Sequence, residues 1–303
     1  MRTLSVVVLL LLGVPGTAAA SPSDVVVHDL DTAGVTAYWT PERIAAMPTG
    51  PSAPPGTPEV NDPTGAPGPV SRTIGRLFFV DRDGEDSSCT ATVVASANRR
   101  TAVTGGHCVH TANLIGQDPR WHTKLLFVPG FRDGARPFGQ FAVRQALVDR
   151  TWITDDQQSE HDQAFLVLDR PSDAAEPIAF GRPGDRPAHE YGYPRAAGQP
   201  GHQGRPEFTG QRLARCWGVP ARNPGYPESP PEENQWGVPC DMGGGASGGP
   251  RISGGAVVGV NTQSFHLAGG QWVPPGEGVR HLGGPQFTWK ITAPLHHRAS
   301  AAR

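Results

Sequence analysis

The chain has 303 residues and a formal net charge of −2, so it is long enough for one large domain or two small ones with an ample core. It contains no long basic stretch, which argues against nucleic acid or an anionic membrane as a partner. Its 39 glycines and 32 prolines favour many short strands and turns over long helices.

Residues 1–20 are typical of an export signal. Arg2 supplies a positive charge, an apolar run from Leu4 to Val14 follows, and Ala18-Ala19-Ala20 offers a cleavage site before Ser21. The run is too short to span a bilayer, which needs about 20 apolar residues. A buried N-terminal strand is the alternative. We therefore expect a secreted protein, free of the membrane after signal removal, in a compartment where disulfides persist.

Residues 21–70 differ in character from the rest of the chain. A short helix is predicted there, because Thr40 is a good N-cap, Pro41 fits the first helical position and Glu42 suits the positive end of the helix. The stretch from Pro48 to Pro69 is rich in Pro, Gly, Thr and Ser, which is typical of an extended linker. Because the region lacks the apolar content for its own core, we interpret it as a propeptide and linker that is later removed. A spacer that stays attached is the alternative.

From Ile74 onward, short apolar and β-branched segments alternate with turn residues. No segment keeps a helical period for more than about two turns, so the series predicts an all-β barrel or sandwich. The strand candidates are Leu77–Val80, Thr90–Ala95, Thr101–Thr104, Leu125–Val128, Phe141–Leu147, Ala164–Leu168, Arg212–Trp217 and Ala256–Asn261.

Four cysteines, Cys89, Cys108, Cys216 and Cys240, allow three disulfide pairings. Pairing the near neighbours, Cys89 with Cys108 and Cys216 with Cys240, closes two short loops and leaves no thiol over. A zinc site is the alternative, but the cysteines and histidines do not occur at ligand spacing on both sides. We therefore favour disulfides over zinc, and the triad mechanism inferred below needs neither a metal nor an organic cofactor.

Three local patterns indicate chemistry, and the first contains His107. The strand candidate Thr101–Thr104 runs through Gly105 and Gly106 into His107 and Cys108. A catalytic histidine needs a fixed ring orientation, and a disulfide at the next residue would hold its loop in place. An ordinary histidine near a strand end is the alternative.

The second pattern places Asp162 just before the apolar run Ala164–Leu168. A carboxylate at the start of a buried strand is desolvated unless a cation or an imidazole N–H pairs with it. Such pairing is the task of the acid that orients a catalytic histidine. Asp149, Asp155 and Asp156 compete for this role, but none leads directly into such a run.

The third pattern runs from Gly243 to Pro250 and surrounds Ser247 with glycines. A nucleophilic serine needs room for the substrate and backbone N–H groups aimed at the oxyanion, and glycines allow both. The expected oxyanion donors are the N–H groups of Gly245 and Ser247. A flexible glycine-rich turn is the alternative.

The order of the three residues decides between hydrolase classes. The stretch from Gly245 to Gly249 also fits G-x-S-x-G, the nucleophile motif of α/β-hydrolase esterases. That class needs an acid and then a histidine after the serine, and the only acid after Ser247 is Glu277. The order His107, Asp162, Ser247 is instead that of the chymotrypsin-type triad.

From about Ile74 to Thr292 the chain resembles the chymotrypsin-like (trypsin-like) serine peptidases, and within them the bacterial secreted branch related to glutamyl endopeptidases. The stretch from Thr104 to Cys108 stands where the family has T-A-A-H-C, and Gly245 to Pro250 where it has G-D-S-G-G-P. Asp162 and the apolar run after it match the family's Asp segment.

This resemblance implies two six-stranded antiparallel β-barrels in a peptidase domain of residues 71–303, at about 74–180 and 181–292, with the active site in the cleft between them. It also implies that Cys89–Cys108 is the disulfide beside the catalytic histidine. The resemblance further implies that the substrates are proteins or peptides, and we expect the protein to be a monomer.

Two departures from the family pattern concern activation and specificity. Ala246 replaces the usual Asp, which in many members pairs with a newly cut N-terminal amine and so forms the oxyanion hole; that switch cannot operate here. Asp241 lies six residues before Ser247, where trypsin-like members place the acid of the S1 pocket, and this favours Arg or Lys at P1. The unusual position of Cys216–Cys240 leaves a solvated turn as the alternative for Asp241.

Glutamyl specificity would require a histidine in the strand after Ser247. Asn261 stands near that position and His266 lies beyond it. We expect Asn261 and Thr262 to belong to the edge strand that pairs with the substrate backbone.

The sequence thus predicts a secreted serine endopeptidase that works through an acyl-enzyme intermediate. A catalytically inactive binding protein on the same fold is the alternative, although such proteins usually lack a triad residue and this chain has all three in order.

Overall fold

The computed structural model describes residues 24–50, 66–68, 71–112, 117–155, 158–181, 185–198, 203–226 and 234–303. The predicted signal peptide and residues 51–65 of the predicted linker lie outside these ranges. Among the helices of the described ranges, none has the length and apolar character needed to cross a membrane.

Six antiparallel strands form the first barrel. The circuit closes because β9 pairs with β8 as well as with β10, giving the order β9-β10-β5-β4-β3-β8. Alternate residues point inward, and Leu77, Phe127 and Leu166 fill the interior without any exposed surface. The strands are β3 (Ile74–Val80), β4 (Asp86–Val93), β5 (Thr101–Thr104), β8 (Thr123–Pro129), β9 (Phe141–Asp149) and β10 (Ala164–Leu168).

The second half of the chain forms two curled sheets that face each other as a second, less completely bonded barrel. One has the order β16-β15-β11-β12-β2 and the other β13-β14-β19-β17-β18. Their strands are β2 (Ala66–Pro67), β11 (Ala188–Gly192), β12 (Ala214–Gly218), β13 (Ala221–Arg222), β14 (Gln235–Pro239), β15 (Pro250–Ser253), β16 (Ala256–Val260), β17 (Gln263–Ala268), β18 (Gln271–Trp272) and β19 (Val279–Pro285). The disulfide Cys216–Cys240 joins the two sheets.

A buried ion pair lies between these two sheets. Arg251 and Glu190 have no exposed side-chain surface, and Arg251 Nη1 lies 3.3 Å from Glu190 Oε1. The guanidinium also donates to the carbonyl groups of Trp236, Gly284 and Pro285 on the facing sheet. Burial lowers the pKa of Arg251 and raises that of Glu190 to about 8, so each charge depends on the other for compensation.

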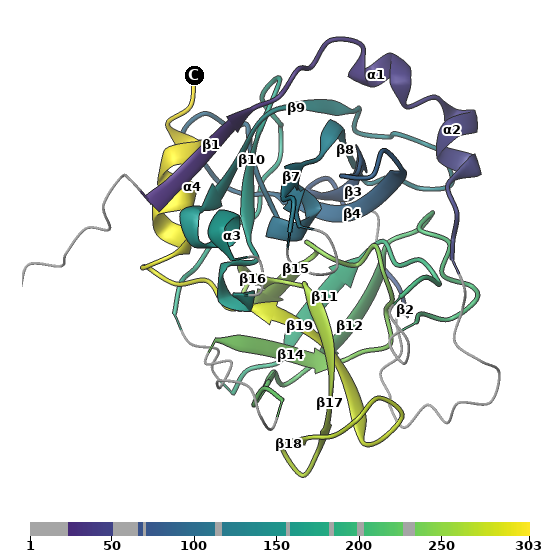
Figure 1. Cartoon of the computed structure of the whole chain (residues 1–303), viewed down its shortest axis with the longest axis vertical. Coiled ribbons are helices and arrows are strands. Elements are labelled where there is room, and N and C mark those ends of the chain that lie inside the picture. Colours follow the sequence, from purple (N-terminus) through teal and green to yellow (C-terminus); the bar gives the residue numbers. More distant parts are fainter. Residues whose placement is uncertain are drawn as a thin grey trace, which may run out of the picture.

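The N-terminal segment and the C-terminal helix both pack on the first barrel, as Figure 1 shows. Strand β1 (Val25–Asp29) pairs with the second half of β9, and the helix α4 (Thr292–Ser300) inserts Leu295 into the cluster that contains Phe165 of β10. The remaining short elements are the helices α1 (Val35–Tyr38), α2 (Pro41–Ala46) and α3 (Arg150–Thr154), the 3₁₀ turns η2 (Gly106–Cys108) and η3 (Ser159–His161), and the strands β6 (His110–Thr111) and β7 (Arg120–Trp121).

The predicted all-β double barrel is confirmed, and the α/β-hydrolase alternative is excluded by the architecture. Each of the eight strand candidates overlaps an observed strand. The helix expected after Thr40 is present as α2, with Thr40 Oγ1 accepting a hydrogen bond from Arg43 N. The segment around it shares a core with the first barrel, since Trp39 is fully buried and Ile44 is 2% exposed. Removal of residues 21–70 as a propeptide stays a prediction.

Candidate active site

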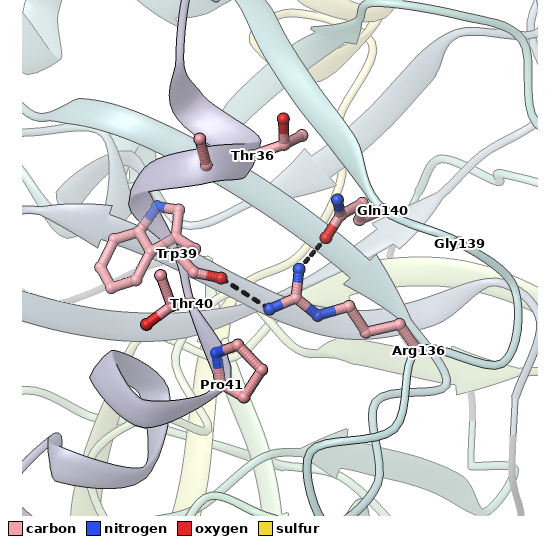
Figure 2. Close-up of a pocket in the computed structure, with 8 residues that line it drawn as sticks. Thr36, Trp39, Thr40, Pro41, Arg136, Gly139 and Gln140 are labelled. Carbon is pink, nitrogen blue, oxygen red and sulfur yellow. Dashed lines mark hydrogen bonds between the residues drawn. The ribbon is translucent and has the colours of Figure 1, made fainter.

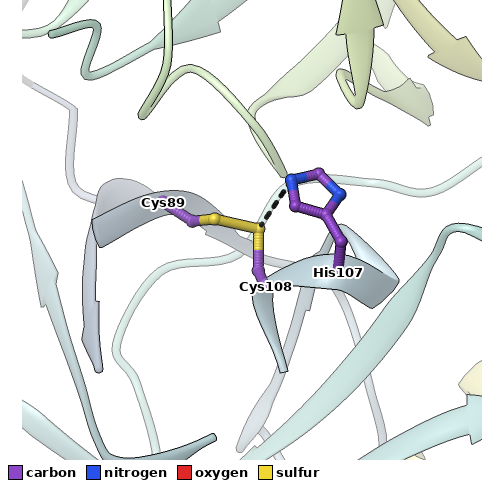
Figure 3. A group of neighbouring side chains, drawn as sticks. All are labelled: Cys89, His107 and Cys108. Carbon is purple, nitrogen blue, oxygen red and sulfur yellow. Dashed lines mark hydrogen bonds between the residues drawn. A yellow bond between two sulfur atoms is a disulfide. The ribbon is translucent and has the colours of Figure 1, made fainter. Parts of the chain in front are cut away.

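His107 lies in η2, directly after β5. Gly106 allows this turn to pack tightly, because a Cβ at Gly106 would lie only 3.0 Å from the Trp152 ring. Figure 3 shows the disulfide Cys89–Cys108 beside the imidazole, with Cys108 Sγ 3.8 Å from His107 Nε2. Both sulfurs belong to the disulfide, so this group offers no thiolate to a metal ion.

Asp162 reaches His107 because of the pairing between two strands. Strands β5 and β10 are antiparallel with Ala164 opposite Thr104, so His107, after β5, and Asp162, before β10, lie at the same end of the barrel. Asp162 is 8% exposed. Its Oδ1 accepts a hydrogen bond from the backbone N–H of His107 at 2.8 Å, and its Oδ2 lies 2.8 Å from Nδ1 of the same residue.

The pKa of His107 is set by two opposing effects. Burial lowers it, but the charge of Asp162 and the hydrogen bond to that carboxylate raise it, and the net result is a pKa above the ordinary value. The carboxylate also selects the tautomer with a proton on Nδ1, which leaves Nε2 able to accept a proton.

Ser247 lies on a glycine-rich loop of the second barrel that presses against the first. Gly245 and Gly248 adopt φ values of +92° and +76°, which favour glycine, and a Cβ at Gly248 would overlap with Thr104. Thr90 of β4 holds the loop by donating from its backbone N–H to the Ser247 carbonyl at 2.7 Å and from Oγ1 to the Gly245 carbonyl at 2.8 Å. Ser247 therefore lies where β4 and β5 of the first barrel meet the second barrel.

Two kinds of hydrogen bond expected of such a site are not formed among the described residues. In the described part of the chain, Ser247 Oγ makes no hydrogen bond to the His107 ring. Likewise, the backbone N–H groups of Gly245 and Ser247 donate to no acceptor among the described residues, whereas the intervening Ala246 N–H donates to the Gly243 carbonyl at 3.3 Å. The Ala246 N–H is thus occupied within its own loop, whereas the two N–H groups beside it have no acceptor among the described residues.

Asn261 was expected to contact the substrate, but in the structure its polar groups bind other parts of the protein. It is fully buried, its backbone exchanges hydrogen bonds with Gly248 and Gly249, and its Nδ2 donates to the Tyr191 carbonyl at 3.0 Å. Its backbone therefore supports the loop that carries Ser247, and its side chain is bound to β11. Thr262 is half-buried, and its backbone N–H donates to the Gly283 carbonyl at 2.7 Å. A contact of Thr262 with substrate stays a prediction.

Asp241 is 8% exposed and forms an ion pair with Arg205, whose Nε lies 3.0 Å from Asp241 Oδ2. A second guanidinium, that of Arg280, is held nearby by the Met242 carbonyl at 2.9 Å and by Ser264 Oγ at 3.3 Å. Burial lowers the pKa of Arg280 to about 10, against an opposing effect of Asp241. Neither arginine was predicted as a neighbour of Asp241, because both are distant from it along the chain.

The two disulfides of the structure, Cys89–Cys108 and Cys216–Cys240, are the near-neighbour pairs. The first joins β4 to the turn that carries His107. The second joins β12 to the residue just after β14, immediately before Asp241. Both therefore fix segments that border the candidate site.

Comparison with known proteins gives the family. No family model and no curated protein matches the chain. A solved thermostable serine protease, AL20 from an extremophilic microorganism, is 30% identical over 77% of this chain and 99% of its own, with a TM-score of 0.60.

Two further solved structures share the fold. The protease Anisep from Arthrobacter nicotinovorans is 23% identical over 78% of this chain and 99% of its own, with a TM-score of 0.60. A Glu endopeptidase is 19% identical over 77% of this chain and 100% of its own, with a TM-score of 0.54. With the double barrel and the identity to AL20 together, the chain belongs to the chymotrypsin-like serine peptidases.

Proposed function

We propose that this serine endopeptidase hydrolyses peptide bonds with Ser247 as nucleophile, His107 as general base and Asp162 as the acid that orients the base. The observation that supports this most is the pair of contacts by which Asp162 holds both the backbone and Nδ1 of His107. A surface histidine needs no such fixation, whereas a general base does.

In the proposed mechanism His107 Nε2 takes the proton from Ser247 Oγ as this oxygen attacks the carbonyl carbon of the scissile bond. Asp162 stabilises the imidazolium that forms. His107 then protonates the leaving amine, and the C–N bond breaks to leave an acyl-enzyme. Water, deprotonated by His107, attacks the acyl-enzyme, releases the carboxylate product and restores Ser247. The contact between Ser247 and His107 tightens in this scheme when substrate binds, as is common for catalytic hydrogen bonds.

The backbone N–H groups of Gly245 and Ser247 are the proposed donors to the oxyanion. They carry no hydrogen bond to the described residues, so the charge that develops on the carbonyl oxygen would be their partner. Such donors contribute most in a site that water leaves when the substrate binds.

We propose protein or peptide substrates and export from the cell. Strong support for an oxidising compartment comes from the two disulfides, since disulfides persist there and are rare in the cytosol. Sequencing the mature N-terminus tests the processing: a start at Ser21 contradicts removal of residues 21–70, and a start near Ser71 supports it.

The test of the proposed function is labelling with a fluorophosphonate probe together with peptide hydrolysis. Labelling and hydrolysis should be lost in Ser247→Ala and kept in Ser253→Ala, whose hydroxyl donates to the Pro187 carbonyl. Labelling that survives Ser247→Ala contradicts the assignment of the nucleophile. A wild-type protein that is neither labelled nor active contradicts the proposed catalysis and favours the alternative of a binding protein.

A further inference from the structure

The loop that carries Ser247 is fixed from its N-terminal side by a second loop, residues 193–197, which follows β11. Arg195 N donates to the Gly244 carbonyl at 2.6 Å, and Gly244 N donates to the Ala197 carbonyl at 2.6 Å. Both polar backbone groups of Gly244 are therefore occupied. Gly244 immediately precedes Gly245, one of the two proposed oxyanion donors, so the position of the 193–197 loop determines where that donor points.

The N-terminal segment of the chain holds the 193–197 loop in turn. Ala197 N donates to the Thr49 carbonyl at 2.7 Å, and Arg195 Nη1 lies 3.4 Å from the Pro48 carbonyl. The contact is close enough to require glycine at position 50, because a Cβ there would overlap with Ala197, and because φ of Gly50 is +77°. Three backbone hydrogen bonds thus connect Thr49 to Gly244 through Ala197 and Arg195.

The segment that supplies Thr49 is itself firmly anchored. Trp39 is fully buried, and its Nε1 donates to the Lys124 carbonyl at 2.6 Å. Figure 2 shows Arg136 reaching across a surface hollow to the Trp39 carbonyl, at 2.7 Å. Met47, only 7% exposed, belongs to the same apolar cluster as Tyr193, the residue at the start of the 193–197 loop. The end of the N-terminal segment is therefore held in a fixed position next to the 193–197 loop.

We propose that Thr49 and Gly50 are positioning residues for the oxyanion hole, so that residues 24–50 form a working part of the catalytic domain. This inference rests on the proposed function. Ala246 carries no charge that an ion pair could use to order the loop, and the neutral backbone bonds from Thr49 to Gly244 supply that order instead. The segment must then stay bound in the active enzyme, which conflicts with the predicted removal of residues 21–70 as a propeptide but not with a cut of the chain between Gly50 and Ile74.

Two glycines of this segment give a matched pair of variants. Gly50 and Gly34 both have left-handed φ values, +77° and +69°, so alanine is strained to a similar degree at each. A Cβ at Gly34 meets nothing within 4 Å, whereas one at Gly50 overlaps with Ala197. Gly50→Ala therefore displaces the 193–197 loop, and Gly34→Ala does not.

The experiment measures kcat and KM against pH for both full-length variants, at a temperature where circular dichroism shows each to be folded. We expect Gly50→Ala to lose at least about tenfold in kcat relative to Gly34→Ala, since loss of one oxyanion donor costs about 10²–10³ and partial displacement costs less. The acid limb of the pH profile should be the same in both, because Asp162 and His107 are untouched. Equal kcat values in the two variants overturn the proposal.

If Gly50→Ala does not fold, the pair Gly50→Ala/Ala197→Gly and Gly34→Ala/Ala197→Gly replaces it. This pair removes the overlap with the Ala197 Cβ and keeps the one with the backbone Cα of residue 197, 2.8 Å from a Cβ at Gly50, so the 193–197 loop is still displaced. A lower kcat in the first supports the proposal, and equal values overturn it. Failure of the proposed function looks different, since the wild-type activity would then be absent or would survive Ser247→Ala.

Discussion

Asp162→Asn tests the proposed triad most directly. The substitution keeps the size of the side chain, but one of the three contacts between this side chain and the His107 backbone and ring changes character. The backbone N–H of His107 still finds an oxygen, whereas Nδ1, 2.8 Å from Oδ2 in the wild type, now faces an amide NH₂. The ring then places its proton on Nε2, and a protonated Nε2 cannot take the proton of Ser247.

The expected loss is large because it removes the base altogether in most molecules. The wrong tautomer in such a triad lowers kcat on the order of 10⁴-fold, or about 5 kcal/mol of transition-state stabilisation. The variant also loses both effects that raise the pKa of His107, while burial continues to lower it. In the wild type, activity should fall as pH drops through the raised pKa of His107, and this acid limb should move to lower pH in Asp162→Asn.

Asp149→Asn is the matched control. Asp149 is also buried and also lies beside a histidine, with Oδ1 2.9 Å from His161 Nδ1, but it caps α3 by accepting from Thr151 N. We expect this variant to keep kcat within about threefold of the wild type and to keep the helix cap, because Asn caps a helix about as well as Asp. Steady-state hydrolysis from pH 5 to 10 measures kcat and the position of the acid limb in both variants. The assignment is refuted if Asp162→Asn keeps kcat within about tenfold, or if the two variants lose the same amount.

Three further predictions concern stability and specificity. Replacing both Cys89 and Cys108 by Ala should lower the free energy of unfolding in urea by about 3 kcal/mol, because the disulfide closes a 19-residue loop; an unchanged midpoint contradicts this. Arg251→Met strands the buried charge of Glu190 and should cost about 3–5 kcal/mol in the same measurement, and the double variant Arg251→Met/Glu190→Leu should recover most of it. If Asp241 borders the S1 pocket, Arg205→Ala removes one of the cations beside its carboxylate and should raise kcat/KM for peptides with Arg at P1 relative to those with Glu. Arg212→Ala, which removes the ion pair with Asp133, should leave this ratio unchanged.

The His107–Asp162 pair also makes stability depend on pH. The folded-state pKa of His107 is raised, so its contribution is fully present below the unfolded-state value of about 6.5 and declines as pH rises through the folded-state pKa. Asp162→Asn should therefore destabilise the protein more at pH 5 than at pH 9. Thermal unfolding at the two pH values measures this, and an equal or reversed difference contradicts the charge interaction.

Features that depend on neighbours in the sequence were predicted correctly. The apolar run Ala164–Leu168 is β10 with the same bounds, and Thr40 with Pro41 starts α2 where the capping pattern placed it. The order of His107, Asp162 and Ser247 led to the fold, because that order distinguishes the chymotrypsin type from the α/β-hydrolases. Such signals are local, since a strand or cap is favoured by the residues that form it.

Features that depend on distant partners required the tertiary structure. β11 was not predicted, because its Glu190 is acceptable in a buried strand only when Arg251, 61 residues away, pairs with it. In the same way, the ion pair with Arg205 changes the role open to Asp241, and the burial of Asn261 gives it a supporting role.

The contact from Thr49 through Ala197 to Gly244 shows the same limit. No property of Gly50 in the sequence separates it from the other glycines of a linker, yet folding places it against the loop that supports Ser247. The sequence by itself determined the catalytic candidates and the strands that carry them, because these follow from residue type and spacing. The tertiary structure decided which groups neutralise, support and orient those candidates, because such contacts form only when separate parts of the chain pack together.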